Sequence, residues 1–215
     1  MRIGIIGGTG DIGEGMSRRL SPHHDVVLGS REAEKAVATS TCTVDLLKER
    51  GVSCSCTGVC NQDAISGVDV IILAVPFTHL ESTVKGLTGF EGKIVVTPVN
   101  PMEKRDFFVF APPPEGSAAL LLKKLLPGAR VVTAFNTIAA NRWKAIDEDI
   151  DVAVPVCSDD DEAKKIVIGI ANGVSKIRAY DAGPLAVSAM VESLTPLLLN
   201  IARYNKMKDV GIRFV

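Results

Sequence analysis

The sequence lacks a charge excess, a long apolar run and a cysteine framework, and each absence excludes a class of protein. Its 24 basic and 25 acidic side chains leave a formal net charge of −1, which gives no electrostatic basis for binding nucleic acid or an anionic membrane. No apolar run approaches the length of a membrane span and the amino terminus reads as a structural strand, so we expect no membrane helix and no signal peptide. Five cysteines, an odd number, fit reduced thiols in the cytoplasm better than disulfides.

The sequence also lacks a convincing metal site or catalytic constellation. Cys54, Cys56 and Cys60 have the spacing C-x-C-x₃-C without a C-x-x-C pair or a nearby histidine, which favours a short edge strand over a zinc site. The acidic run 159–162 precedes a helix and is interpreted as a helix cap rather than a metal cluster. His79 is a candidate general acid, although a histidine at a helix start is more often a cap or surface residue. We therefore predict no metal and no catalytic side chain.

What is present is a glycine fingerprint near the amino terminus. Gly8, Gly10 and Gly13 match G-x-G-x-x-G between an apolar strand, 3–6, and an amphipathic helix, 11–20. In this motif the first glycine permits a tight turn, the second lets the backbone approach a pyrophosphate and the third lets the helix pack on the strand. A phosphate there meets free amides and a helix dipole. The pattern predicts a dinucleotide site.

The end of the second predicted strand, 25–28, indicates which dinucleotide binds. NAD sites carry a carboxylate at this tip, whereas this chain has Ser30 and Arg31, with Lys35 one helical turn beyond. The guanidinium of Arg31 offers a planar fork to a 2′-phosphate, so we predict NADP. The alternative is that Arg31 and Lys35 form a solvated helical turn with Glu32 and Glu34.

The remaining pattern predicts an α/β fold, a Rossmann-like, mostly parallel sheet with a small C-terminal helical segment. Further strands are expected at 54–60, 68–75, 93–96, 130–135, 152–157 and 176–180, and helices at 36–50, 61–67, 117–126, 163–172 and from 185. The proline-rich segment 107–116 is expected to be an exposed loop. Because the carboxyl ends of parallel strands face the ligand, the residues after three strands are site candidates. They are Val75, Pro76 and Phe77, then Val99 and Asn100, then Asn136, Thr137 and Ile138.

From residue 185 apolar side chains recur at helical spacing, with Pro196 as an expected kink. This stripe must pack on the sheet or on a second subunit, and it makes a homodimer the expected assembly. We predict an NADP-binding domain over 1–182 and a C-terminal helix and tail over 183–215 that completes the substrate site and the dimer interface.

Several blocks of this chain resemble the F420-dependent NADP oxidoreductases over nearly the whole length. They are Ile6-Gly-Gly-Thr-Gly10 with Gly13, Gly29-Ser-Arg31 with Lys35, Val156-Cys-Ser-Asp-Asp-Asp161, Asp181-Ala-Gly-Pro-Leu185, and Val191-Glu-Ser-Leu-Thr-Pro-Leu197 through Gly211-Ile-Arg-Phe214. The last two blocks are the specific ones.

The resemblance implies reversible hydride transfer between NADP(H) and the deazaflavin coenzyme F420, with both rings stacked at the carboxyl edge of the sheet. It implies NADP contacts from Thr9, Asp11, Ile12 and Ala140, and deazaflavin contacts from the loop after Phe135, from Leu185 and from the tail near Val210. Such chemistry requires position and dryness more than side-chain acids or bases. One departure is Asn136, where family members often have histidine; asparagine can bind a carboxamide or a ring carbonyl but cannot become cationic.

Three other functions are weighed against this one. An NADPH-dependent reductase of a small imine or ketone, similar to pyrroline-carboxylate reductase, would share the fold. Tyr204 and Lys208 form the Y-x-x-x-K of short-chain dehydrogenases but lie at the extreme C-terminus, which argues against that chemistry. A non-enzymatic NADP-sensing domain, resembling the cytosolic part of membrane ferric reductases, would accompany membrane helices.

Overall fold

The computed structural model describes all 215 residues and is built around one eight-stranded sheet. Its spatial order is β10-β9-β8-β5-β4-β1-β2-β3. The strands are β1 (Arg2–Ile6), β2 (Asp25–Ser30), β3 (Ser55–Cys60), β4 (Val70–Leu73), β5 (Ile94–Thr97), β8 (Arg130–Thr133), β9 (Ala153–Cys157) and β10 (Arg178–Gly183). The six from β3 to β8 are parallel, β9 meets β8 in antiparallel fashion through one residue pair, and β10 is parallel to β9. The predicted Rossmann-like, mostly parallel sheet is confirmed.

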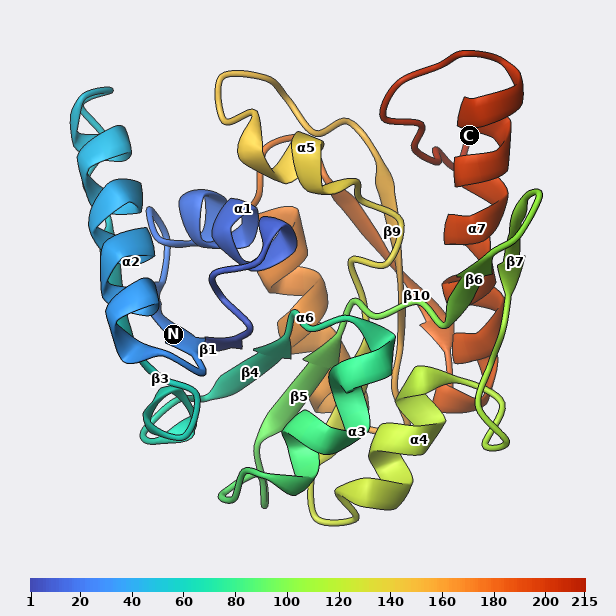
Figure 1. Ribbon diagram of the computed structural model, residues 1–215, viewed down its shortest axis with the longest axis horizontal. Coiled ribbons are helices and arrows are strands. Elements are labelled where there is room, and N and C mark those ends of the chain that lie inside the picture. Colours follow the sequence, from blue (N-terminus) through green and yellow to red (C-terminus); the bar gives the residue numbers. More distant parts are fainter.

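Helices cover both faces of the sheet (Figure 1). Helices α1 (Asp11–Leu20), α2 (Ala33–Lys48), α5 (Ala140–Lys144) and α6 (Asp161–Asn172) bury one face, and α3 (Phe77–Lys85) and α4 (Ala118–Leu125) bury the other. Short 3₁₀ turns lie at Asp63–Ile65 and Leu185–Val187. Neighbouring residues of one strand therefore enter different cores: Ile72 packs with the α1 side and Ile71 with the α3 side. This double burial explains why the central strands read as continuous apolar runs.

Several parts of the chain differ from expectation. Segment 107–116 is not all loop, because Phe108–Phe110 forms β7 and pairs with β6 (Met102–Lys104) in an antiparallel hairpin. The side-chain amide of Asn200 binds both the amide and the carbonyl of Phe108, a tertiary contact that the local sequence does not reveal. Strand β10 begins two residues later than expected and extends through Gly183, and 140–144 is helix where a loop was expected.

The last helix, α7 (Ser188–Tyr204), stands beside the β6–β7 hairpin at the edge of the molecule farthest from α2 (Figure 1). Our expectation that no apolar run reaches the length of a membrane span is wrong. Residues 185–204 reach it, with a mean hydropathy of 1.6 over an 18-residue stretch, of which 33% is buried in the fold. Length and composition are weak evidence for a span, and the helix packs on its own domain through polar side chains described below.

The C-terminal tail folds back onto the sheet after α7. The amide of Ala153 in β9 donates to the carbonyl of Ile212 at 2.7 Å. Arg213 pairs with Asp151, and Phe214 packs edge to face on Tyr180 of β10. These contacts fix the end of the chain beside β9.

Candidate cofactor site

A cavity of about 490 Å³ opens where the carboxyl ends of β1, β2 and β4 meet. The chain leaves β1 toward β2 and β3 and then returns across β1 to β4, so this is the topological switch point of the sheet. Ligands of open α/β sheets bind at such a crevice. Seven predicted residues line the cavity or its rim: Thr9, Gly10, Ser30, Arg31, Lys35, Val75 and Pro76.

The turn after β1 is built around Gly7 rather than Gly8. Gly7 has a left-handed φ of 77°, and a Cβ there would lie 2.6 Å from the carbonyl oxygen of Ala74. Gly8 instead joins its amide to the carbonyl of Gly29 in β2 at 2.8 Å. Gly13 fills the packing role expected of it, because its Cβ would lie 2.6 Å from the Cα of Gly8. Glycine at these positions lets α1 press against the turn.

Helix α1 begins without a side-chain cap, since Gly10 occupies the N-cap position. The first amides of the helix, at Asp11 and Ile12, therefore have room to meet an anion, which the helix dipole also favours. The Asp11 carboxylate does not close this end, because Lys144 of α5 binds it together with Glu14. These ion pairs raise the pKa of Lys144, so the positive charge of Lys144 stays close to the start of α1, in addition to the partial positive charge of the helix dipole.

The side chains predicted to bind the 2′-phosphate lie at and just beyond the tip of β2. Ser30 is buried and its hydroxyl accepts the amide of Glu32 at 3.3 Å. Arg31 is exposed and has no acidic partner, whereas Lys35 pairs with Glu32 at 2.7 Å. Part of the alternative, a solvated ion-paired turn, is therefore present, yet all four side chains line the same cavity.

The opposite wall was missed by sequence reasoning. It is formed by one face of α3 and the two residues that follow the helix's last residue: His79, Ser82, Thr83, Gly86 and Leu87. Asn61, after β3, completes the lining. The available signal was the helical period after Pro76, which places His79 on this wall of the cavity.

Two asparagines meet beyond the cavity, where β5 and β8 end. The Asn136 side-chain amide donates to the carbonyl of Val99 at 3.0 Å and to the Asn100 Oδ1 at 3.3 Å, and the Asn100 amide donates to the Asn136 carbonyl at 3.0 Å. Asn136 is 4% exposed, and its Oδ1 has no hydrogen-bond partner. The Val99 carbonyl can only accept, so the unpartnered atom of this amide is an oxygen. A buried acceptor without a donor is costly, and a ligand N–H would satisfy it.

The residue before this pair has an unusual backbone. Phe135 is 2% exposed and has a φ of 68°, a left-handed value that non-glycine residues adopt at a cost of about 1–3 kcal/mol. Its ring packs edge to face on Trp143 of α5. Strain of this kind concentrates at functional sites, and here it directs the chain from β8 into Asn136.

The remaining predicted residues do not line the cavity. Val99 and Ile138 are buried in opposite cores, Thr137 is buried with its hydroxyl near the Ala153 carbonyl, and Ala140 is half-buried at the start of α5. Phe77 turns toward the α3–α4 core. Leu185 is 1% exposed in that core, so its side chain does not reach the cavity. Val210 is half-buried in the tail.

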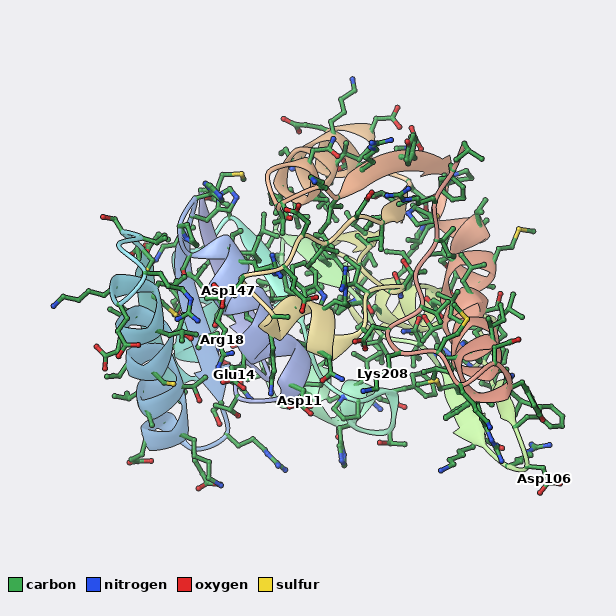
Figure 2. The ribbon with its side chains drawn as sticks, turned by 90° about the horizontal axis from the view of Figure 1, so that it is seen from above. Asp11, Glu14, Arg18, Asp106, Asp147 and Lys208 are labelled. Carbon is green, nitrogen blue, oxygen red and sulfur yellow. The ribbon has the colours of Figure 1, made fainter.

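The two ends of the chain contribute to one side of the molecule. Figure 2 shows Lys208, from the tail after α7, on the side that also carries Asp11 at the start of α1. Asp106, at the tip of the hairpin, lies at the far corner beyond α7.

The three groups whose pKa is raised most by burial lie outside the cavity. Burial raises the pKa of Cys56 to about 12, of Cys157 to about 11 and of Glu192 to about 7. None of the three lines the cavity. The arrangement can hold and orient a dinucleotide, and it leaves the chemistry to bound redox groups.

Comparison with known proteins gives a consistent family. Residues 2–101 match the model of the family described as "NADP oxidoreductase coenzyme F420-dependent". The F420-dependent NADP reductase of Methanocaldococcus jannaschii is 37% identical over 99% of this chain and 97% of its own length. The enzyme of the same name from Methanothermobacter thermautotrophicus is 30% identical over 99% of this chain and 94% of its own.

A solved structure gives the same picture of the fold. The crystal structure of a putative F420-dependent NADP reductase from an Arthrobacter species has a TM-score of 0.80, with 20% identity over 100% of this chain and 99% of that one. Full-length similarity, the uncapped start of α1 and the basic tip of β2 agree, and the chain belongs to the F420-dependent NADP reductase family.

Proposed function

We propose that this protein catalyses reversible hydride transfer between NADP(H) and coenzyme F420. The observation that carries the proposal is the full-length similarity to two enzymes of that name. The NADP-type tip of β2, with Arg31 free of an acidic partner, supports the nucleotide half of the proposal independently.

Ten residues at the β1 and β2 ends and the β4 loop would hold the NADP nucleotide. The uncapped amides of α1 bind the pyrophosphate, and Arg31 clamps the 2′-phosphate with the Ser30 hydroxyl. Lys35 exchanges Glu32 for this phosphate, since a dianion attracts it more strongly than one exposed carboxylate. The set is Gly8, Thr9, Gly10, Asp11, Ile12, Gly13, Ser30, Arg31, Lys35 and Val75.

The ring half of the site lies toward β5 and β8. The bound cofactors supply the chemistry, a hydride passing between C4 of the nicotinamide and C5 of the deazaflavin. The residues of this half would hold both rings and exclude water, for which no acid or base is required. The Asn136 Oδ1 accepts a ligand N–H, and Asn100 holds the Asn136 backbone. Pro76, Phe77, Val99, Asn100, Asn136, Thr137, Ile138, Ala140, Leu185 and Val210 form the surroundings of the rings, with Leu185 acting from the core behind them.

The chain divides by role into 1–182, which binds NADP, and 183–215, which completes the deazaflavin side. The contacts of the tail with β9 and of α7 with the Asn136 loop support this division.

Purified protein mixed with NADPH and oxidised F420 tests the function. We expect the absorbance of the deazaflavin to fall as it is reduced, and the reverse reaction with reduced F420 and NADP⁺. Absence of exchange at every pH, together with NADPH-dependent turnover of a small imine or ketone, would establish the alternative activity. Tight NADPH binding without any acceptor would indicate a sensing domain.

We also propose a cytoplasmic homodimer. The outer face of α7 exposes Met190 (71%), Leu197 (54%), Ile201 (37%) and Tyr204 (68%), and these positions share one side of the helix. Met102 and Phe107 of the neighbouring hairpin extend the apolar surface. A second copy, related by a two-fold axis, would bury the same patch on both subunits. All five cysteines are unpaired, which suits a reducing compartment.

A further inference from the structure

The inner face of α7 is held to the domain by polar side chains. Ser188, Glu192, Thr195 and Asn200 each bind a different part of the fold: the Ser117 hydroxyl, the start of α4, the Asn136 carbonyl and strand β7. Of the apolar side chains of α7, by contrast, Val191, Pro196 and Leu198 are buried while four large ones are exposed. A typical surface helix is held in place by a buried apolar stripe. The position of α7 depends more on these hydrogen bonds.

Glu192 makes the central contact of this row. It is fully buried, and its two carboxylate oxygens accept the amides of Ala118 at 2.8 Å and Ala119 at 3.1 Å. The Ser117 hydroxyl accepts the next amide, that of Leu120. All three free amides in the first turn of α4 are thus satisfied, two of them by a residue 74 and 73 positions later in the chain. Negative charge at this helix end is also favoured by the dipole of α4.

One helical turn beyond Glu192 lies the contact with the ring half of the site. The Thr195 hydroxyl donates to the Asn136 carbonyl at 2.7 Å, and the Asn100 amide donates to the same oxygen. This peptide follows the left-handed Phe135, a conformation that neighbouring contacts must maintain. The direction of the unpartnered Asn136 Oδ1 consequently depends on where α7 places Thr195.

We infer that Glu192 is a positioning residue for the deazaflavin side of the site. By binding the start of α4 from α7, Glu192 fixes Thr195 on the Asn136 carbonyl and so aims the Asn136 amide at the ligand. The inference rests on the proposed function, because the ring half is assigned there. Glu192 has no such role for the adenosine half of the site, because that half lies beyond β1 and has no contact with α7.

The test is a double-mutant cycle with Glu192→Gln and Thr195→Val. The first variant keeps the shape of the side chain and replaces one acceptor by a donor, and the second removes the donating hydroxyl without changing volume. At pH 8 we expect each to raise the KM for F420 about tenfold, as for loss of one well-placed hydrogen bond. The dissociation constant of 2′,5′-ADP, which reports the adenosine half alone, stays unchanged. Because both variants break one chain of contacts, the double variant should resemble either single one.

Asp160→Asn is the matched control. Asp160 pairs with Arg130 of β8 at 2.6 Å and caps α6 through the Ala163 amide at 2.9 Å, so this variant removes an ion pair that has no hydrogen bond to Asn136. It should lower the melting temperature without changing the KM for F420. The inference is overturned if Glu192→Gln lowers the melting temperature and leaves the KM for F420 as it was, or if the effects of Glu192→Gln and Thr195→Val simply add. Failure of the wild-type protein to exchange hydride would instead contradict the proposed function.

Discussion

Arg31 is the residue on which we expect the choice between NADP and NAD to depend. It is exposed at the tip of β2, lines the cavity and has no acidic partner. We expect Arg31→Asp to raise the KM for NADPH by roughly 100-fold and to change the KM for NADH little, because a charge-assisted contact of about 3 kcal/mol is replaced by repulsion. Steady-state kinetics with both nucleotides measures the change.

Arg105→Asp serves as the control for Arg31→Asp, since Arg105 lies on the hairpin away from the cavity. Unaltered preference for NADPH in the Arg31 variant would show that another group selects the 2′-phosphate.

Glu192 makes stability depend on pH. Burial raises the pKa of this carboxyl from 4.5 to about 7 in the folded protein, although the Ala118 and Ala119 amides lower it in part. A carboxyl whose pKa is higher in the folded protein than in the unfolded chain stabilises the fold fully at pH values below the unfolded pKa. This stabilisation is lost as the pH rises through the folded pKa. We therefore expect the free energy of unfolding to fall by up to roughly 3 kcal/mol between pH 4.5 and pH 8. Urea unfolding across this range should show the fall in the wild type and a flatter curve in Glu192→Gln.

At the level of elements, we expect the contact of α1 with the glycine turn to determine how the pyrophosphate binds. In Gly13→Ala the new Cβ would meet the backbone of Gly8 at 2.6 Å, so α1 must shift and its first amides move from the phosphate. We expect a loss of about 1–3 kcal/mol in stability and at least a tenfold rise in the KM for NADPH. Thermal unfolding and steady-state kinetics test this.

Gly169→Ala in α6 is the matched substitution, because no atom lies within 4 Å of its Cβ position. It should raise stability by roughly 0.5–1 kcal/mol without changing the kinetics. If Gly13→Ala behaves in the same way, the close approach of α1 to the turn is not essential.

At the scale of the whole molecule, the exposed apolar face of α7 leads us to expect a homodimer. Leu197→Glu places a charge in the exposed apolar patch and should convert a dimer to a monomer, as sedimentation velocity would show. Val37→Glu is the control, since Val37 is comparably exposed (49%) but lies on α2 at the opposite edge. A wild-type monomer at micromolar concentration would contradict the proposed interface.

Prediction from sequence succeeds where local pattern and function coincide. The strand, turn and helix around Gly8 to Gly13, the basic tip at Arg31 and the apolar central strands are confirmed because each is encoded within a few residues. The β6–β7 hairpin and the α3 wall with His79 are missed, since the first depends on Asn200 and the second on the side of the cavity that α3 faces. The turn glycine is misassigned by one residue, because φ at Gly7 depends on Ala74 of another strand.

The sequence by itself determined the fold class, the nucleotide and the family, since hydrophobic periodicity, glycine spacing and the side-chain chemistry of short segments are local properties. Only the tertiary structure decided that Glu192 caps a distant helix, that the Asn136 Oδ1 lacks a donor and that Leu185 lies in the core. These facts depend on which groups meet across long separations in the chain. Hydrogen-bond satisfaction and burial are properties of such meetings, and no short stretch of sequence contains them.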